Sequence, residues 1–277
     1  MSKYGRQNPK EEDYIVDPHL IEKFRADGCV TLESVLTENE VLEIERTFDQ
    51  FLTREIKVPG KDFCDMSKPF NTLFENYSIV NCMLPTHYHK QFANNVFERL
   101  TAKIVKQFHP TIVMCKDYDQ LLNKRPGKED AKFAWHQDLG YWPSPEVLGI
   151  DETATCTFSL AIDDSDEENG CLGYVPGSGL SRKLREHKPL SGSRDEGHAL
   201  TIDVKDDEVK LAPAKRGSVT VHDEWVVHGS GGNSSKTRNR RTYVLAYRPQ
   251  AVVDAERRIG FTHSHNDSVN WDTFENV

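Results

Sequence analysis

The chain has 277 residues, of which 37% are hydrophobic and 29% are charged, and its formal net charge is −9. This composition is typical of a globular protein with a substantial core, and the acidic balance argues against a nucleic-acid-binding protein. No apolar run is long enough to span a bilayer, and residues 1–17 lack the apolar stretch of a signal peptide, so we expect a cytoplasmic protein with no membrane partner.

Local signals define the first elements well. Residues 1–17 are polar and predict a flexible N-terminal arm. Asp17-Pro18 begins a helix, because aspartate caps helices and proline is favoured at the first helical position, and Gly28 ends it. A short strand is expected over 29–32. The segment Thr37–Glu40 is a capping box that opens a second amphipathic helix.

The next stretch mixes a loop, a histidine pair and a helix. Residues 57–75 contain a Pro-Gly pair and a further proline, which predict a long loop. His87 and His89 would share one side of a strand, but no carboxylate accompanies them, so we treat them as a weak ligand pair. Residues 91–108 carry the strongest helical pattern, and its apolar stripe is most simply a core-facing surface.

From residue 111 the apolar clusters become short, and turn residues separate them. This rhythm is typical of an antiparallel sandwich or barrel rather than of βαβ units. The sequence therefore predicts a mainly β protein with N-terminal helices, an α+β arrangement, and one domain without an internal linker. The expected strands lie within 111–124, 154–163, 170–176, 200–204, 208–213, 217–228 and 241–248.

Two loops between these strands are informative. Residues 163–170 are acidic but lack the spacing of an EF-hand, so a solvated turn is the better interpretation. Residues 177–199 form a long polar loop with a basic run and two histidines, His187 and His198. Such a loop is either a lid over a site or simply exposed.

One stretch, Trp135-His-Gln-Asp-Leu-Gly-Tyr-Trp142, carries candidate chemistry. If the backbone is extended, His136 and Asp138 point to the same face of a strand. An imidazole and a carboxylate on one face are two of the three ligands of a 2-His-1-carboxylate site, which binds non-haem Fe(II) and leaves coordination positions open. An H-x-D triplet is common by chance, so the assignment depends on a third ligand.

The third ligand and an anion-binding residue are expected near the end of the β region. His222 and His228 differ by an even number of positions, so one strand would place both on one face, and spacing alone does not choose between them. Arg240 and Arg241 begin an apolar strand. An arginine there suits an iron oxygenase, because its planar fork binds the distal carboxylate of 2-oxoglutarate in bidentate fashion. Neighbouring residues face opposite sides, so only one of the two serves.

These motifs together resemble the phytanoyl-CoA dioxygenase family of Fe(II)/2-oxoglutarate oxygenases, which includes natural-product hydroxylases. Residues 135–142 are similar to the family's W-H-Q-D-x-x-Y. Residues 163–178 look like its D-D-x-x-x-E-N-G-C-L-x-x-x-P-G-S-H segment, and residues 228–235 look like its H-G-S-x-x-N-x-S. The resemblance extends over roughly residues 20–250.

The resemblance implies a double-stranded β-helix, a cupin-like jelly roll whose inner face holds the metal. His136, Asp138 and His228 would bind iron, and His222 would be a neighbour rather than a ligand. The domain would run over 18–277, and its parts would be a helical region 18–110, a jelly-roll core 111–250 and a C-terminal extension 251–277.

The resemblance also implies a co-substrate site. Arg240 matches the family's 2-oxoglutarate arginine, because it precedes another basic residue at the start of the last core strand. The hydroxyl of Ser230 would assist the same carboxylate, and Phe133 and Gln120 match positions that line this pocket. One departure is a longer loop before Arg240, which makes Arg238 a rival. The others are Ser159, where many relatives carry Trp, and Ser178-Gly179, which lacks the usual histidine.

The resemblance implies an oxygenase that uses Fe(II), O2 and 2-oxoglutarate to hydroxylate or otherwise oxidise a small organic molecule, with release of succinate and CO2. Desaturation, epoxidation and ring formation would need the same site, whereas Asp138 argues against a halogenase. The alternatives are a cupin-type hydrolase or isomerase with another divalent metal, and a non-catalytic jelly-roll binding protein. Neither requires a keto acid anchor such as Arg240.

The substrate and the oligomeric state stay open. The candidate walls of a substrate pocket are Tyr141, Trp142 and the loops 57–75 and 177–199, because they flank the expected metal position.

Overall fold

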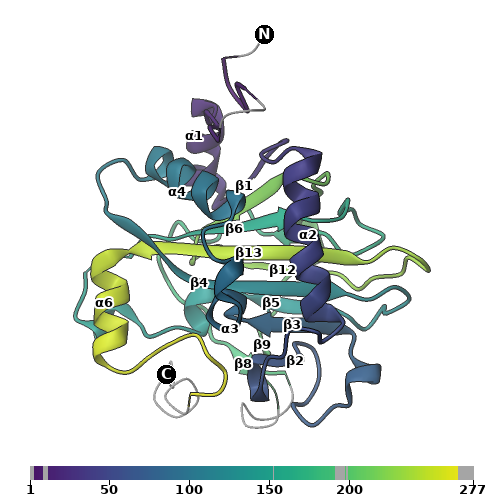
Figure 1. Ribbon diagram of the computed structural model, residues 1–277. Helices are drawn as coiled ribbons and strands as arrows, with labels where there is room; N and C mark the ends of the chain where they lie inside the picture. The colour runs from purple at the N-terminus through teal and green to yellow at the C-terminus, as the bar shows by residue number, and fades with distance from the viewer. Residues whose placement is uncertain (1–2, 9–11, 152, 191–196, 198, 268–277) are drawn as a thin grey trace.

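The computed structural model describes residues 3–8, 12–151, 153–190, 197 and 199–267, and the strands in this part of the chain form antiparallel sheets (Figure 1). The seven-stranded sheet has the order β1 (Cys29–Leu32), β11 (Val219–His222), β6 (Cys156–Ala161), β13 (Arg240–Pro249), β4 (Met114–Lys124), β3 (Ile79–Met83) and β2 (Phe63–Asp65). The four-stranded sheet has the order β10 (Lys210–Ala212), β7 (Leu172–Tyr174), β12 (His228–Ser230) and β5 (Phe133–His136). A third, two-stranded sheet consists of β8 (Lys188–Pro189) and β9 (Leu200–Thr201), and it lies next to β5. The predicted jelly roll is confirmed.

The large sheet has two different faces, because side chains alternate along each strand. On the central strands β4 and β13, Leu121 and Tyr243 point into the main hydrophobic core. Gln120 and Thr242, one position away, line a cavity that residues of both sheets enclose. The outer face of the large sheet therefore carries the core, and its inner face carries the cavity.

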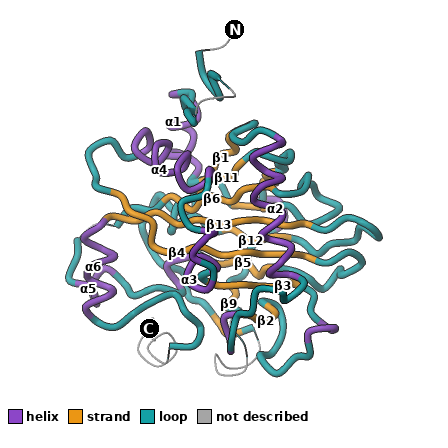
Figure 2. The backbone as a smooth tube through the Cα atoms, in the orientation of Figure 1, coloured by secondary structure: helices purple, strands orange, loops and turns teal. Residues whose placement is uncertain are grey.

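Helices cover the outer face of the large sheet, as Figure 2 shows. The long ones are α1 (Pro18–Asp27), α2 (Glu38–Leu52) and α4 (Val96–Phe108). Each contributes buried side chains to the main core, for example Phe48 from α2 and Phe97 from α4, both fully buried. Burying one such side chain stabilises the fold by about 2 kcal/mol. The shorter helices are α3 (Pro85–Tyr88), α5 (Pro145–Leu148) and α6 (Gln250–Arg258).

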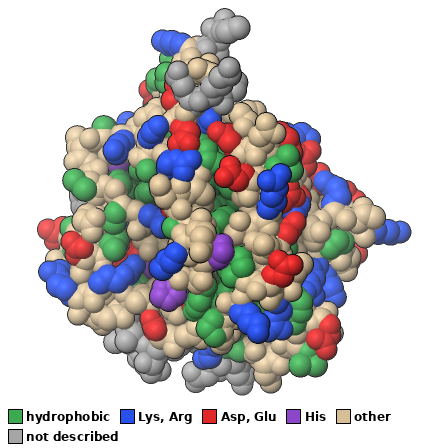
Figure 3. Space-filling model, viewed as in Figure 1, with side chains coloured by type: hydrophobic (Ala, Val, Ile, Leu, Met, Phe, Trp, Pro, Cys, Tyr) green, Lys and Arg blue, Asp and Glu red, His purple; other side chains and the backbone are tan. Residues whose placement is uncertain are grey.

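Short 3-10 turns complete the fold: η1 (Gly60–Asp62), η2 (Phe74–Asn76), η3 (Lys90–Phe92), η4 (Asp138–Gly140) and η5 (Asp206–Glu208). On the face seen in Figure 3, acidic and basic side chains are interspersed. Within the described residues, no helix is long and apolar enough to cross a membrane.

The first elements form where local signals predict them. The Asp17 side chain accepts a hydrogen bond from the amide of His19 and caps α1. Gly28 ends that helix with φ of 81°, a left-handed conformation that glycine adopts without steric cost. Thr37 and Glu40 form the expected capping box at the start of α2. These contacts involve near neighbours in the sequence, which is why the sequence alone predicts them.

Two elements differ from expectation. The helix expected over 91–108 begins only at Val96, because the Asn95 side chain accepts from the amides of Phe97 and Glu98 and caps it there. The pair His87 and His89 does not lie on a strand, since Pro85 opens the short helix α3 in front of it. Neither histidine belongs to a group of metal-binding side chains among the described residues.

The expected strand over 217–228 is two strands, β11 and β12, in different sheets. Asp223 breaks it, because its carboxylate accepts hydrogen bonds from the amides of Trp225 and Val226 and closes a turn. The loop expected over 57–75 likewise contains the short strand β2, which pairs with β3. Strand β2 forms because it pairs with a strand distant in sequence, and not because of its local propensity.

Part of the expected N-terminal arm is packed against the body. Tyr14 and Val16 are buried in the main core, and Glu12 forms an ion pair with Arg99 on α4. The polar composition of residues 1–17 does not predict this packing. Two apolar side chains are enough to hold a short segment against the body. In the described part of the chain, the two sheets enclose a cavity lined by several polar side chains.

Candidate metal centre

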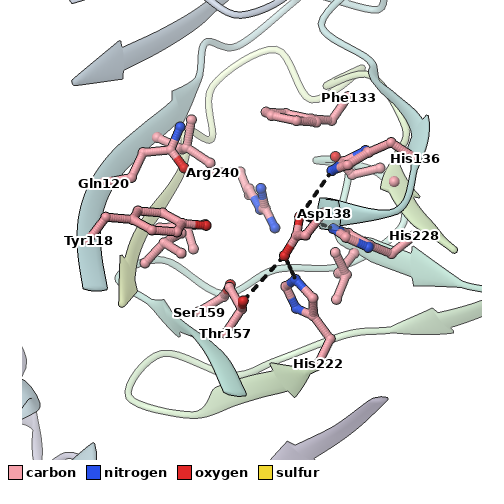
Figure 4. Close-up of a pocket in the computed structure, with 16 residues that line it drawn as sticks. Tyr118, Gln120, Phe133, His136, Asp138, Thr157, Ser159, His222, His228 and Arg240 are labelled. Carbon is pink, nitrogen blue, oxygen red and sulfur yellow. Dashed lines mark hydrogen bonds and ion pairs between the residues drawn. The ribbon is translucent and has the colours of Figure 1, made fainter. Parts of the chain in front are cut away.

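Three side chains converge on one point at the end of the cavity (Figure 4). His136, the last residue of β5, pairs directly with His228, the first residue of β12, so both rings lie on one face with their centroids 4.3 Å apart. Asp138 lies just past β5 in the turn η4, not on an extended strand as expected. The turn still returns its carboxylate, and Oδ1 lies 3.4 Å from Nε2 of each histidine.

The tautomers of both histidines leave Nε2 free to bind a metal. Nδ1 of His136 donates to the carbonyl of Ala134 at 2.7 Å, and Nδ1 of His228 donates to the carbonyl of Val226 at 3.0 Å. A carbonyl only accepts, so Nδ1 of each ring carries a hydrogen, and Nε2 is the nitrogen that can bind a metal. Asp138 raises the pKa of His228, so a metal would displace a proton from Nε2 of that ring. These two nitrogens and the carboxylate of Asp138 lie within 4.8 Å of one another.

This donor set fits a divalent metal. Burial raises the pKa of the Asp138 carboxyl, but His228, His136 and His222 together outweigh that effect and hold the pKa well below its usual range. The carboxylate is therefore ionised and able to bind a cation. Two neutral imidazoles and one carboxylate on one side of a metal leave its other side open, which is the arrangement of non-haem Fe(II) oxygenases.

The second oxygen of Asp138 has different neighbours. Its Oδ2 lies 3.3 Å from Nε2 of His222 and 3.3 Å from the hydroxyl of Thr157. A carboxylate oxygen only accepts, so Nε2 of His222 carries the hydrogen and has no lone pair to offer a metal. His222 thus lies beside the three ligands as a hydrogen-bond donor. Thr157 was not predicted, because its role depends on strand β6 lying opposite the turn.

Glycine is required between His228 and Ser230. A Cβ atom at Gly229 would lie 2.9 Å from the carbonyl oxygen of Phe133 and 3.1 Å from the ring of Trp135. The H-G-S sequence therefore reflects how closely β12 approaches β5 at the site.

The cavity above the three ligands has a volume of about 510 Å³, including the part open to solvent. Both sheets contribute to its wall, as expected for the inside of a jelly roll. Every residue that the resemblance assigned to the co-substrate lines it, and so does Ser159. These lining residues are Gln120, Phe133, Ser230 and Arg240.

Arg240 is the cation of this cavity. Its side chain is buried, and its Nε has no hydrogen-bond partner among the described residues. Burial lowers its pKa to about 10, so the guanidinium stays charged at neutral pH. Figure 4 shows it between the row of Tyr118 and Gln120 and the three ligands. A buried charge without a partner is costly, so the site is completed when an anion binds.

The two rival arginines are engaged elsewhere. Arg241 faces the outer side of the sheet and bonds to the carboxylates of Glu45, Asp49 and Asp163. Arg238 lies at the surface, where it bonds to carboxylates of the acidic turn. Of these three arginines, only Arg240 lines the cavity.

The described part of the loop after residue 177 contacts the turn that carries Asp138. Nε2 of His187 accepts a hydrogen bond from the amide of Gln137 at 3.0 Å, and the Gln137 side chain bonds to the backbone of Lys183 and Arg185. Burial lowers the pKa of His187 to about 4, which keeps the ring neutral and able to accept. His198, the other histidine of this loop, lies outside the described residues.

The other expected pocket walls contact the same region. The ring of Tyr141 lies 5.2 Å from that of His136. Trp142 is buried in a smaller apolar cluster with Tyr118 and Phe261. Neither residue is among those that line the cavity, so they are not the pocket walls expected from the sequence.

A second group of metal-binding side chains does not fit a metal. Asp117, Glu256 and His263 lie close together, but Arg248 and Arg257 form ion pairs with both carboxylates. Two guanidinium groups already neutralise the two acids, and they would repel a cation. We interpret this group as a structural ion network.

Comparisons with known proteins identify the family that the chain matches. The family model described as phytanoyl-CoA dioxygenase (PhyH) matches residues 24–242. The chain is 27% identical to an ectoine dioxygenase of Streptomyces coelicolor over 79% of this chain and 73% of that protein. It is 22% identical to the peroxisomal phytanoyl-CoA dioxygenase of Rattus norvegicus over 82% and 69%.

Solved structures show the same fold. EvdO2 from Micromonospora carbonacea var. aurantiaca, complexed with 2-oxoglutarate, matches with a TM-score of 0.69 and 22% identity, over 84% of this chain and 91% of that one. The apo form of EctD from S. alaskensis matches with a TM-score of 0.64 and 16% identity, over 89% and 80%.

Proposed function

The chain belongs to the phytanoyl-CoA dioxygenase (PhyH) family, and from this premise we propose that it is an Fe(II)/2-oxoglutarate-dependent oxygenase that oxidises a small organic molecule. One observation carries the proposal: two histidines and one aspartate converge at one end of a cavity that also contains a buried arginine without a partner for its Nε. A metal ligand set alone would fit several reactions. The added anion site is what a keto acid co-substrate needs.

We assign the metal to His136, Asp138 and His228. When bound, Fe(II) supplies the chemistry that couples O2 and the decarboxylation of 2-oxoglutarate, with release of succinate and CO2, to oxidation of the substrate. The protein holds the two imidazoles through their Nδ1 hydrogens. A metal bound there would have three protein donors on one side and would keep room for other ligands on its opposite side.

We assign the distal carboxylate of the co-substrate to Arg240 and Ser230. The guanidinium offers paired donors to a carboxylate, and the hydroxyl offers one more. Phe133 and Gln120 line the same cavity and would exclude water from it. The Gln120 side chain donates to Asn81 at 2.6 Å, which fixes its orientation.

The alternatives are less well supported. A hydrolase or isomerase that uses a divalent metal does not need an anion site beside its metal. A non-catalytic binding protein does not need one either. The cavity is a recess between the two sheets that side chains of both sheets line, and this shape supports a small organic substrate. We also propose that residues 18–277 act as one domain, in which the helical part 18–110 supports the jelly-roll core 111–250.

The test is the absorbance of the protein under anaerobic conditions on addition of Fe(II) and then 2-oxoglutarate. We expect a weak charge-transfer band only when both are present. Arg240→Ala is expected to need about 10- to 100-fold more 2-oxoglutarate, because it loses charge-assisted hydrogen bonds.

Arg238→Ala is the matched control, since Arg238 bonds only to surface acids in the described part of the chain. Its titration is expected to follow that of the wild type. No band in folded wild-type protein would overturn the oxygenase assignment. A weakened titration in Arg238→Ala but not in Arg240→Ala would move the anchor to Arg238.

A further inference from the structure

A buried lysine continues the row of cavity residues on β4. Gln120 and Leu122 line the cavity, and Lys124 is the next residue at period two. It pairs directly with Arg240 on β13, so the two side chains share the inner face of the sheet. Lys124 is only 1% exposed. Two basic side chains therefore lie next to each other inside the fold.

The amine of Lys124 contacts the co-substrate end of the cavity through Ser230. Its Nζ donates to the hydroxyl oxygen of Ser230 at 2.6 Å and to the carbonyl oxygen of Gly231. Among the described residues it forms no ion pair with a carboxylate. Burial lowers the pKa of Lys124 well below its usual value, and the charge of Arg240 lowers it further.

The hydrogen bond from Lys124 determines how Ser230 can act. A hydroxyl group has one hydrogen to donate and two lone pairs that accept. When the oxygen accepts from Nζ, the hydroxyl hydrogen is directed to another partner. Ser230 lines the cavity and Lys124 lies behind it, so the cavity is where an acceptor for this hydrogen would lie.

We propose that Lys124 is a positioning residue for a dicarboxylic keto acid: it holds Ser230 so that its hydroxyl donates to the distal carboxylate beside Arg240. This inference rests on the proposed function and adds a residue that the sequence motifs did not identify. It predicts that Lys124 contributes to binding of keto acids with a second carboxylate, and not to binding of the keto acid group at the metal.

The experiment compares two keto acids on Fe(II)-loaded protein without O2. One is 2-oxoglutarate, and the other is 2-oxopentanoate, which has the same carbon chain but a methyl group in place of the distal carboxylate. Binding is followed by the charge-transfer band in wild type and in Lys124→Met. We expect the Kd for 2-oxoglutarate to rise about 10-fold or more, and the Kd for 2-oxopentanoate to stay unchanged.

Two further variants make the result specific. Lys116→Met removes a lysine from the same strand whose amine bonds to Glu98 and Thr86, away from the cavity. It is expected to change neither Kd. Lys124→Gln keeps a hydrogen-bond donor on a shorter side chain, so a smaller rise in the Kd for 2-oxoglutarate is expected. If Lys124→Met fails to fold, Lys124→Gln replaces it as the test variant.

The outcomes separate this inference from the proposed function. If wild type binds both keto acids and the Lys124 variants bind 2-oxoglutarate as tightly, Lys124 has no positioning role and the oxygenase assignment stands. An equal rise for both keto acids would show a general structural effect and would also overturn the inference. If wild type binds neither keto acid, the proposed function itself fails.

Discussion

Asp138 has two carboxylate oxygens with separate tasks. Oδ1 faces the two histidines that share the candidate metal site, at 3.4 Å from each. Oδ2 faces His222 and Thr157, each at 3.3 Å. Donors on the far oxygen of a ligating carboxylate fix its orientation, and their loss usually weakens metal binding. The pair His222 and Thr157 therefore aims Oδ1 at the metal.

We expect Thr157→Val to lower the affinity for Fe(II) or Co(II) by about 10-fold, because the variant keeps the shape of the side chain but loses the donor. The measurement is a metal titration against a competing chelator, with thermal unfolding as a check on the fold. Ser159→Ala is the control, since Ser159 lies on the same strand and faces the same cavity. Equal affinities for wild type and Thr157→Val would show that Oδ2 needs no such donor.

At the scale of elements, the turn between β11 and β12 is the main departure from the sequence prediction. One strand over 217–228 would place His222 and His228 far apart along a single face. The turn sends the two strands into different sheets, and the rings of the two histidines come within 4.2 Å. Asp223 closes this turn by accepting two backbone hydrogen bonds.

Asp223 also makes this turn sensitive to pH. Burial raises its pKa from 3.8 to about 6, with a further contribution from Glu224. A carboxyl group whose pKa is raised by folding stabilises the fold most below its unfolded pKa, and this contribution is lost as the pH rises through about 6.

We expect Asp223→Asn to be more stable than wild type at pH 8, by on the order of 2 kcal/mol, since asparagine keeps the acceptor oxygen without a buried charge. The difference should shrink towards pH 4.5. Unfolding midpoints at pH 8, 6 and 4.5 measure it. Asp254→Asn, a change at an exposed position of α6, should have no such effect. A difference that does not vary with pH would refute the titration of Asp223 as its cause.

At the scale of the whole molecule, the described part of the C-terminal extension is tied to the body by buried charges. Arg248, at the end of β13, is fully buried and bonds to Glu256 of α6 and to Asp117 of β4. Its guanidinium also lies 4.4 Å from the ring of Trp142, just after the metal-binding turn. Asp62 accepts hydrogen bonds from the backbone and side chains of the same extension. The extension therefore supports the wall of the site from behind.

We expect Arg248→Met to destabilise the fold by about 3–5 kcal/mol, because it leaves two buried acids without their main cation. Adding Glu256→Gln should recover part of that loss, since one uncompensated charge is removed. Urea unfolding of wild type, both single variants and the double variant gives the coupling energy. If the change in unfolding free energy of the double variant equals the sum of the changes in the two single variants, the two residues do not act as a pair.

The sequence by itself determined the local elements and the identity of the candidate site residues. Capping at Asp17 and Thr37 involves neighbouring residues, so it can be predicted without the fold. The resemblance named the three candidate ligands and favoured Arg240 over its rivals. The period of two along a strand already separates Arg240 from Arg241, and the structure has the two on opposite faces.

Only the tertiary structure decided which distant residues complete the site. It brings Asp138 back to the histidines although the strand has ended, and it divides 217–228 between two sheets. The roles of Thr157 and Lys124 follow from strands that lie opposite one another but far apart in sequence. Capping and periodicity describe a residue's relation to its near neighbours, whereas these contacts depend on how the sheets pair and face each other.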